Sequence, residues 1–259
     1  MRQARTLRGP DELRELVEGY FEELAFTPEL GTLEGPMRHA LGGKRVRPVL
    51  TLAAADAVDG DVEAALPAAA AVELVHSFSL VHDDLPSLDD DAERRGAPSV
   101  WAAYGEATAI LAGDALVTEA FRLALSYPGP EVARELAVAT LGMIGGQQLD
   151  LERSADLAAL HALKTGALFS ASVMCGLWAA GLPAAEHAPW RAFAAELGLL
   201  FQIVDDILDG DGYVAEVGAA EARRLADEAG DRAQARLAAI PAATATLSEI
   251  VAALVARTT

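Results

Sequence analysis

Two dense clusters of aspartate are the residues of this sequence best suited to chemistry. The first, VHDDLPSLDDD, spans residues 81–91, and the second, FQIVDDILDG, spans residues 201–210. Each follows a strongly apolar stretch, so its carboxylates stand at the end of a helix whose other turns are buried. Carboxylate oxygens suit Mg²⁺, which binds a few of them and completes its shell with water and substrate phosphate. The two clusters therefore predict a magnesium site.

The placement of these carboxylates is unfavourable unless a cation is present. A helix C-terminus carries partial negative charge, which destabilises a carboxylate there by several tenths of a kcal/mol. Asp205 and Asp209 lie one helical turn apart, at about 6 Å, where like charges repel. A solvated acidic face is the alternative interpretation, but two clusters of the same form favour a metal site. An EF-hand calcium loop does not fit, because Ile207 or Gly218 would fall in a ligand position.

Basic residues gather in three places of this acidic chain. Lys44 and Arg47 lie in GGKRVRP, Arg94 and Arg95 directly follow the first aspartate cluster, and Lys164 begins the motif KTG. Cations beside a candidate magnesium site indicate an anion with more charge than a carboxylate, and phosphate fits. Structural salt bridges are the alternative for any one of these residues. The glycines of GGKRVRP do not form a Walker loop, because the chain contains no GxxxxGK[ST].

The composition excludes several classes of protein. The 259 residues include 39 acidic and 20 basic side chains, and the net charge of -19 argues against nucleic-acid binding, which needs a basic face. A hydrophobic content of 52% supports a packed core rather than disorder. The one cysteine, Cys175, excludes a disulfide framework. The first residues lack the apolar core of a signal peptide, so we expect a cytoplasmic protein.

The elements that must position the clusters are predicted to be helices. Apolar residues recur every three or four positions over 11–24, and further helices are predicted over 64–84, 101–126, 131–150, 156–181 and 188–209, with two solvated helices in 219–257. Short turns separate them, which predicts one large all-α bundle. The uncharged stretch from Thr165 to Ala185 is long enough to span a bilayer, but its glycines, serines and proline favour a buried helix. We therefore expect no membrane span.

Six motifs resemble, in the same order, those of the trans-isoprenyl diphosphate synthases, the group of farnesyl and geranylgeranyl diphosphate synthases. They are GGKRVRP, HDDLPSLDDDAERRG, LAGDAL, GGQQLDL, KTGALF and FQIVDDILD, and they extend from about Gly42 to Asp209. The resemblance implies one domain over residues 1–259, folded as an all-α bundle of the isoprenoid synthase type with a central apolar cavity. It also implies several Mg²⁺ ions as cofactor, small diphosphates as substrates, and a homodimer.

The resemblance assigns roles residue by residue. It implies that one side of the magnesium site is formed by Asp83, Asp84 and Asp89, and that the other side is formed by Asp205, Asp209 and, in support, Asp206. It implies that the diphosphate of an allylic substrate is contacted by Arg94, Lys164, Thr165 and Gln202. Isopentenyl diphosphate would be held by Lys44, Arg47, Arg95 and His76, although a histidine alone is more typical of a core. The residues expected to act in catalysis are Asp83, Asp84, Asp89, Asp205, Asp206 and Lys164.

The reaction that the resemblance implies is a condensation of isopentenyl diphosphate with dimethylallyl or geranyl diphosphate. Metal ions and basic residues would neutralise the departing diphosphate so that its bond to the allylic carbon ionises, and an apolar wall would keep water from the carbocation. Phe78 precedes Asp83 by about one and a half helical turns and so lies deeper in the cavity. A bulky aromatic at this position stops chain growth early in the family, so we expect a C15 product. Core packing is the alternative role for Phe78.

The sequence departs from the family pattern after Asp209. Family members continue with a loop whose glycine–lysine pairs close over the diphosphate, whereas here residues 210–214 lead almost directly into a helix, with no lysine after Lys164. The loss is expected to weaken allylic diphosphate binding or to speed its release. It raises a second hypothesis, a non-catalytic or regulatory paralogue that binds a partner synthase. A terpene cyclase is less favoured, because such cyclases lack GGKRVRP and carry a different second motif.

Overall fold

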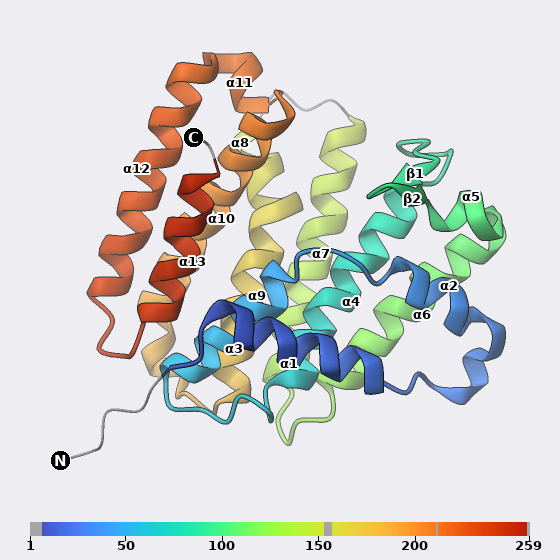
Figure 1. Ribbon diagram of the computed structural model, residues 1–259, viewed down its shortest axis with the longest axis horizontal. Helices are drawn as coiled ribbons and strands as arrows, with labels where there is room; N and C mark the ends of the chain where they lie inside the picture. The colour runs from blue at the N-terminus through green and yellow to red at the C-terminus, as the bar shows by residue number, and fades with distance from the viewer. Residues whose placement is uncertain (1–6, 153–156, 211, 258–259) are drawn as a thin grey trace.

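The computed structural model describes residues 7–152, 157–210 and 212–257, and it confirms the all-α bundle (Figure 1). The first half contains α1 (Pro10–Glu23), η1 (Pro28–Leu33), α2 (Glu34–Ala40), α3 (Val46–Ala57), α4 (Leu66–Asp83), β1 (Glu93–Arg94), β2 (Ala97–Pro98), α5 (Val100–Tyr104) and α6 (Glu106–Ala124). The second half contains α7 (Glu131–Leu151), α8 (Leu157–His161), η2 (Ala162–Gly166), α9 (Ala167–Ala179), η3 (Ala184–Glu186), α10 (His187–Asp209), α11 (Gly212–Val217), α12 (Ala219–Ala238) and α13 (Ala245–Ala256).

The predicted helices are found close to their expected bounds, with two interruptions. The range 101–126 forms two helices, because Gly105 adopts φ 87° and ψ 154°, which no helix can continue through. The range 156–181 is divided into α8, the π-helical segment η2 and α9. Residues 153–156 lie outside the described chain, so the first position of that predicted helix is not described.

Helix α9 lies at the centre of the hydrophobic core. It is buried almost continuously from Leu168 to Leu177 and packs against α3, α4, α7 and α10. Helix α3 comes so close that a Cβ atom on Gly176 would lie 2.1 Å from the carbonyl oxygen of Thr51, so this crossing needs glycine. Burial raises the pKa of the Cys175 thiol, which therefore packs as a small protonated hydrophobe.

One stretch of the described chain, Ala159–Ala179, is long and apolar enough to cross a membrane by length and composition. It consists of the end of α8, η2 and α9. Half of its most apolar window is buried inside the bundle. Because the α9 part is enclosed by four other helices, its apolar composition is that of a core helix.

The bundle brings both aspartate clusters to the same end. Helix α4 ends at Asp83, and α10 ends at Asp209, where Gly210 adopts a left-handed conformation with φ 76°. Figure 1 shows the chain leaving α4 toward the β1–β2 hairpin and leaving α10 toward α11, both at the upper end of the view. The antiparallel hairpin pairs Arg94 with Ala97 and so carries the basic residues back toward the first cluster.

Candidate active site

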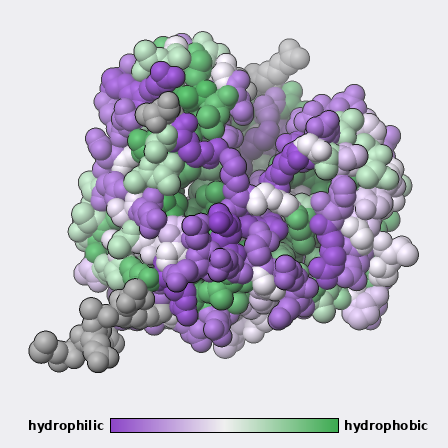
Figure 2. Space-filling view, viewed as in Figure 1, coloured by the Kyte–Doolittle hydropathy of each residue, from purple (hydrophilic) through white to green (hydrophobic). Residues whose placement is uncertain are grey.

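A cavity of about 430 Å³ opens between α4, α7 and α10. Asp83 lines it from α4, Asp205 from α10 and Lys164 from η2, so the two aspartate clusters and one predicted cation share one space. In the space-filling view, hydrophilic residues border hollows in the middle of this face, with hydrophobic residues deeper inside (Figure 2). The apolar part of the lining is formed by Phe78, Leu80, Leu88, Met143, Ile144, Leu151, Leu168 and Phe201.

The two aspartates that line this central cavity carry raised pKa values. Burial, with smaller contributions from the negative charges of Asp89 and Asp84, raises the pKa of Asp83 from 3.8 to about 6, although Lys164 and Arg94 oppose the shift. Burial and the neighbouring Asp209 likewise raise the pKa of Asp205. Half-buried carboxylates repelled by their neighbours attract a multivalent cation, so this donor set fits Mg²⁺.

Within the described residues, no three acidic, His or Cys side chains stand close enough together to form a metal cage by themselves. Asp89 and Asp209, both exposed, do not line the central cavity. This arrangement suits an ion that takes few ligands from the protein and the rest from water and phosphate oxygens.

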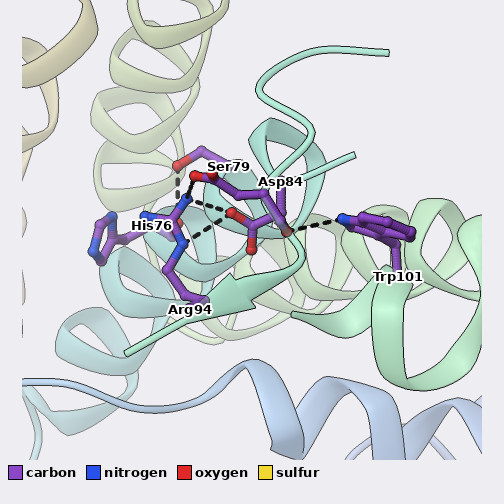
Figure 3. A network of polar contacts seen from close by, with 6 residues as sticks. His76, Ser79, Asp84, Arg94 and Trp101 are labelled. Carbon is purple, nitrogen blue, oxygen red and sulfur yellow. Dashed lines mark hydrogen bonds and ion pairs between the residues drawn. The ribbon is translucent and has the colours of Figure 1, made fainter. Parts of the chain in front are cut away.

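Asp84, unlike its neighbour Asp83, does not line the central cavity but is paired with an arginine. It is 2% exposed, and Arg94 Nε donates to its Oδ1 at 2.9 Å (Figure 3). Arg94 also contacts Asp91, whose carbonyl oxygen accepts a hydrogen bond from the indole of Trp101. The structure therefore pairs the buried Asp84 carboxylate with the partly exposed Arg94 guanidinium, and the pair holds the loop that follows α4.

A second, basic pocket of about 530 Å³ adjoins the central cavity and shares Arg47, His76 and Asp205 with it. All four residues predicted to hold isopentenyl diphosphate line this pocket. They are Lys44, Arg47, His76 and, from the hairpin end, Arg95. Two pockets with a common wall could place two diphosphate substrates side by side.

Arg47 is the cation of the basic pocket that is best prepared for an anion. Its Nε is buried without a hydrogen-bond partner, while its guanidinium carbon lies 4.6 Å from the ring centroid of Phe169 and 5.6 Å from that of Phe201. Burial lowers the pKa of Arg47 to about 10, which still leaves it charged at neutral pH. The pKa of His76 is lowered well below its ordinary value, mainly by burial and to a smaller extent by the charges of Arg47 and Arg95. His76 is therefore neutral at neutral pH. A buried, unpaired guanidinium N–H fits a phosphate oxygen.

The glycines of GGKRVRP have a role in placing Arg95. The Arg95 guanidinium donates to the carbonyl oxygen of Gly42, and a Cβ atom on Gly43 would lie 2.7 Å from the guanidinium carbon. Arg45, in contrast, is buried and paired with Glu73 at 2.9 Å and with Glu18 at 3.0 Å. Its charge is already balanced, so within this motif the cations that face the pocket without an ion pair are Lys44 and Arg47.

The structure does not bring Gln202 and Asp206 to the central cavity. Gln202 lines a separate pocket with His161 and Tyr213, and its Nε2 donates to Asp206 Oδ1 at 2.5 Å. Asp206 is buried and also accepts the backbone N–H of Tyr213 at 2.9 Å. A Cβ atom on Gly212 would lie 2.1 Å from Asp206 Oδ2, so the turn needs glycine there. Asp206 thus anchors α11, which occupies the shortened connection after Asp209.

Gln147 and Arg257 are among the cavity residues that were not identified from the sequence. Gln147 lines the central cavity, and its Oε1 is buried without a partner; the motif GGQQLDL contained it, but its spacing gave no chemical reason to single it out. Arg257 lines the basic pocket from the end of α13, and nothing in the local sequence distinguishes it from other surface arginines of the tail.

The chain resembles known proteins over most of its length. The family model for polyprenyl synthetase matches residues 31–221. A farnesyl diphosphate synthase from Bacillus subtilis is 40% identical over 193 residues, which cover 68% of this chain and 65% of that protein. One from Geobacillus stearothermophilus is 40% identical over 220 residues, covering 76% of this chain and 74% of that protein. A geranylgeranyl diphosphate synthase from Cyanophora paradoxa is 42% identical over 184 residues. The chain spans 65% of the length of the Bacillus subtilis protein and 61% of the length of the Cyanophora paradoxa protein, which is less than two thirds in both cases.

Solved structures match more completely. The crystal structure of an FPP/GFPP synthase from Zymomonas mobilis superposes with a TM-score of 0.85 at 32% identity, covering 95% of this chain and 97% of that one. A geranyltransferase from Legionella pneumophila gives a TM-score of 0.83 at 32% identity, with 96% of each chain covered. The matched family region includes both aspartate clusters, η2 and most of the basic pocket. From its motifs, its fold and these matches together, the chain belongs to the polyprenyl synthetase family, that of the trans-isoprenyl diphosphate synthases.

Proposed function

We propose that this protein is a transferase that condenses isopentenyl diphosphate with dimethylallyl or geranyl diphosphate to a short-chain trans-prenyl diphosphate. The observation that carries the proposal is the common wall of the two pockets, where Arg47, His76 and Asp205 separate an aspartate-lined cavity from an arginine-lined one. One hydrophobic core joins the helices that carry both clusters, which supports the proposal that the whole chain acts as one domain.

The allylic substrate occupies the central cavity in this proposal. Magnesium would be held by Asp83, Asp89 and Asp84 on one side and by Asp205 and Asp209 on the other, and when bound it would neutralise the leaving diphosphate. Lys164 and Thr165 bind the same diphosphate from η2. Arg94, which is paired with Asp84, lines the basic pocket and not the central cavity, so in this proposal it acts from the edge of the allylic site. Gln202 with Asp206 supports the end of α10.

Isopentenyl diphosphate occupies the basic pocket, held by Lys44, Arg47, Arg95 and neutral His76. The allylic carbon–oxygen bond breaks with its electron pair leaving on the diphosphate, and the double bond of isopentenyl diphosphate attacks the resulting cation. The proton lost from the new chain passes to the departed diphosphate, so no side-chain base is needed. The apolar lining of the cavity excludes water from the cation.

A direct assay tests the proposed function. The purified protein, with Mg²⁺, labelled isopentenyl diphosphate and allylic diphosphates of increasing length, is expected to form linear diphosphates, and excess EDTA is expected to reduce the rate at least about 10³-fold, because it withdraws several kcal/mol of charge stabilisation. Returning Mg²⁺ should restore the rate. No condensation with any allylic partner would favour the paralogue, and a cyclic hydrocarbon product would favour the cyclase.

We propose further that the protein is a cytoplasmic homodimer that pairs through the outer faces of α6 and α7. Val138 and Leu141 on α7 are 69% and 70% exposed, and Ile110 and Leu111 on the adjoining α6 are 45% and 54% exposed. Apolar side chains of this size gathered on two neighbouring helices are typical of a protein interface.

The dimer predicts the effect of charges placed on α7. The double variant Val138→Glu, Leu141→Glu is expected to be monomeric in light scattering coupled to gel filtration, because four carboxylates would meet at the two-fold interface. Leu125→Glu is the control, since Leu125 is also exposed but lies about 21 Å along α6 from Leu111. A wild-type protein that is monomeric at micromolar concentration would contradict the proposal.

A further inference from the structure

The π-helical segment η2 brings Lys164 and Thr165 to the wall of the central cavity. A π-turn contains more residues than an α-turn, so its backbone bulges outward, and such bulges are frequent at functional sites. Both α7 and α10 pack against η2. The backbone of Lys164 is therefore held between these two helices, and its side chain is paired with Asp150 of α7.

Gly146 of α7 is where the approach is closest. A Cβ atom on Gly146 would lie 2.5 Å from the backbone nitrogen of Lys164, 2.7 Å from its Cα and 2.8 Å from its Cβ. These atoms cannot rotate aside as the end of a long side chain can. Gly146 has an ordinary helical backbone without a positive φ, so this position does not require the conformational freedom of glycine. Glycine within a helix is less stable than alanine, and what it contributes here is room.

Two milder contacts hold the same bulge. On α10, a Cβ atom on Gly198 would lie 3.1 Å from the Cα of Gly166, the last residue of η2. On α7, a Cβ atom on Gly142 would lie 3.1 Å from the Cβ of Ala167, which directly follows η2, and 3.8 Å from the carbonyl oxygen of Leu163 within η2. Helices α7 and α10 thus enclose η2 from two sides, and the smallest clearance is at Gly146.

We propose that Gly146 is a positioning residue, which sets the place of Lys164 and Thr165 and, through them, the binding of the allylic diphosphate. The proposal rests on the proposed function, in which these two residues belong to the allylic site. It concerns one substrate only, because Lys44 comes from the segment before α3 and Arg95 from the turn of the hairpin, and neither belongs to η2.

The neighbouring glycine provides a matched control. Gly145 lies in the same helix, and a Cβ atom there would meet nothing within 4 Å. Gly145→Ala is expected to leave both KM values and kcat within about 2-fold of wild type. Gly146→Ala is expected to raise KM for geranyl diphosphate at least 10-fold and to lower kcat, while KM for isopentenyl diphosphate changes less than about 2-fold; these factors follow from a loss of one charge-assisted contact.

Two further measurements test whether Gly146 acts through Lys164 and Thr165. In a Lys164→Ala background, Gly146→Ala should lower kcat/KM by a smaller factor than it does in the wild type, because the Lys164 contact is already lost and only Thr165 can still be displaced. If Gly146→Ala does not fold, as judged by circular dichroism, Gly142→Ala should show a smaller rise in the same KM. Equal kinetics for Gly145→Ala and Gly146→Ala, or equal rises in both KM values, would overturn the proposal. A wild type without condensation would instead refute the proposed function.

Discussion

Asp83→Asn should reduce kcat/KM by about 10³-fold or more, because about 4 kcal/mol of transition-state stabilisation depends on the metal that this carboxylate would hold. Asp83 lines the central cavity, opposite Asp205. Asparagine keeps the shape of the side chain but removes the charge, so the loss should appear mainly in the dependence on Mg²⁺ concentration. Initial rates measured over a series of Mg²⁺ concentrations would check this.

The same substitution should stabilise the protein when Mg²⁺ is absent. The pKa of Asp83 is raised from 3.8 to about 6, so its ionised form destabilises the folded state above pH 6, and this cost disappears as the pH falls toward 4. The difference corresponds to at most about 3 kcal/mol, and solvent screening of a partly exposed group reduces it to about 1–2 kcal/mol. In EDTA, Asp83→Asn should therefore have the higher Tm at pH 7.5, with little difference from wild type near pH 4.

Asp90→Asn is the control for both effects. Asp90 belongs to the same aspartate cluster but is exposed, and its left-handed backbone (φ 55°) accepts asparagine well. It should change the rate by less than about 3-fold and the Tm only slightly, as surface substitutions do. If Asp83→Asn retains wild-type activity, or if its Tm in EDTA is unchanged at pH 7.5, the proposed role of Asp83 is wrong.

The sequence predicted the helices of the core well, since their apolar periodicity is set by packing. The interruptions were harder to predict for local reasons. Gly105 ends one helix by its positive φ, yet Gly113, Gly145 and Gly146 occur inside helices without ending them. Whether a glycine breaks a helix or makes room for a neighbour depends on what packs against it, and that neighbour is distant in the chain.

The motifs predicted which residues share a cavity better than they predicted how each of those residues is paired. The motifs placed Asp83, Lys164 and Asp205 together, and the structure finds all three on one cavity. The motifs could not separate Asp83, which faces that cavity, from Asp84, whose carboxylate is paired with Arg94. Adjacent residues on a helix point about 100° apart, so one motif can supply both a carboxylate that lines a cavity and a carboxylate that pairs with a neighbouring arginine.

Phe78→Ala should lengthen the product beyond the proposed C15. Phe78 lines the central cavity one and a half turns below Asp83, and its ring meets the His82 ring edge to face, with centroids 5.1 Å apart. His82 is in turn held by the carbonyl oxygen of Ile110 at 3.1 Å, and a Cβ atom on Gly113 would lie 2.2 Å from its ring. The Phe78 ring is therefore a supported part of the cavity wall, and removing it is expected to open space for a growing chain.

Phe78→Tyr is the appropriate control, because it keeps the ring and should keep the product length. The stability cost of Phe78→Ala should be below the roughly 3–5 kcal/mol of a fully buried phenylalanine, since Phe78 is only half-buried and already lines the cavity. The alanine variant should then remain folded and active, so that chain lengths can be compared by chromatography of the dephosphorylated alcohols. If Phe78 served core packing alone, its removal would lower the Tm without changing the product length. An unchanged distribution of product lengths together with a lower Tm would therefore contradict the proposed role of Phe78.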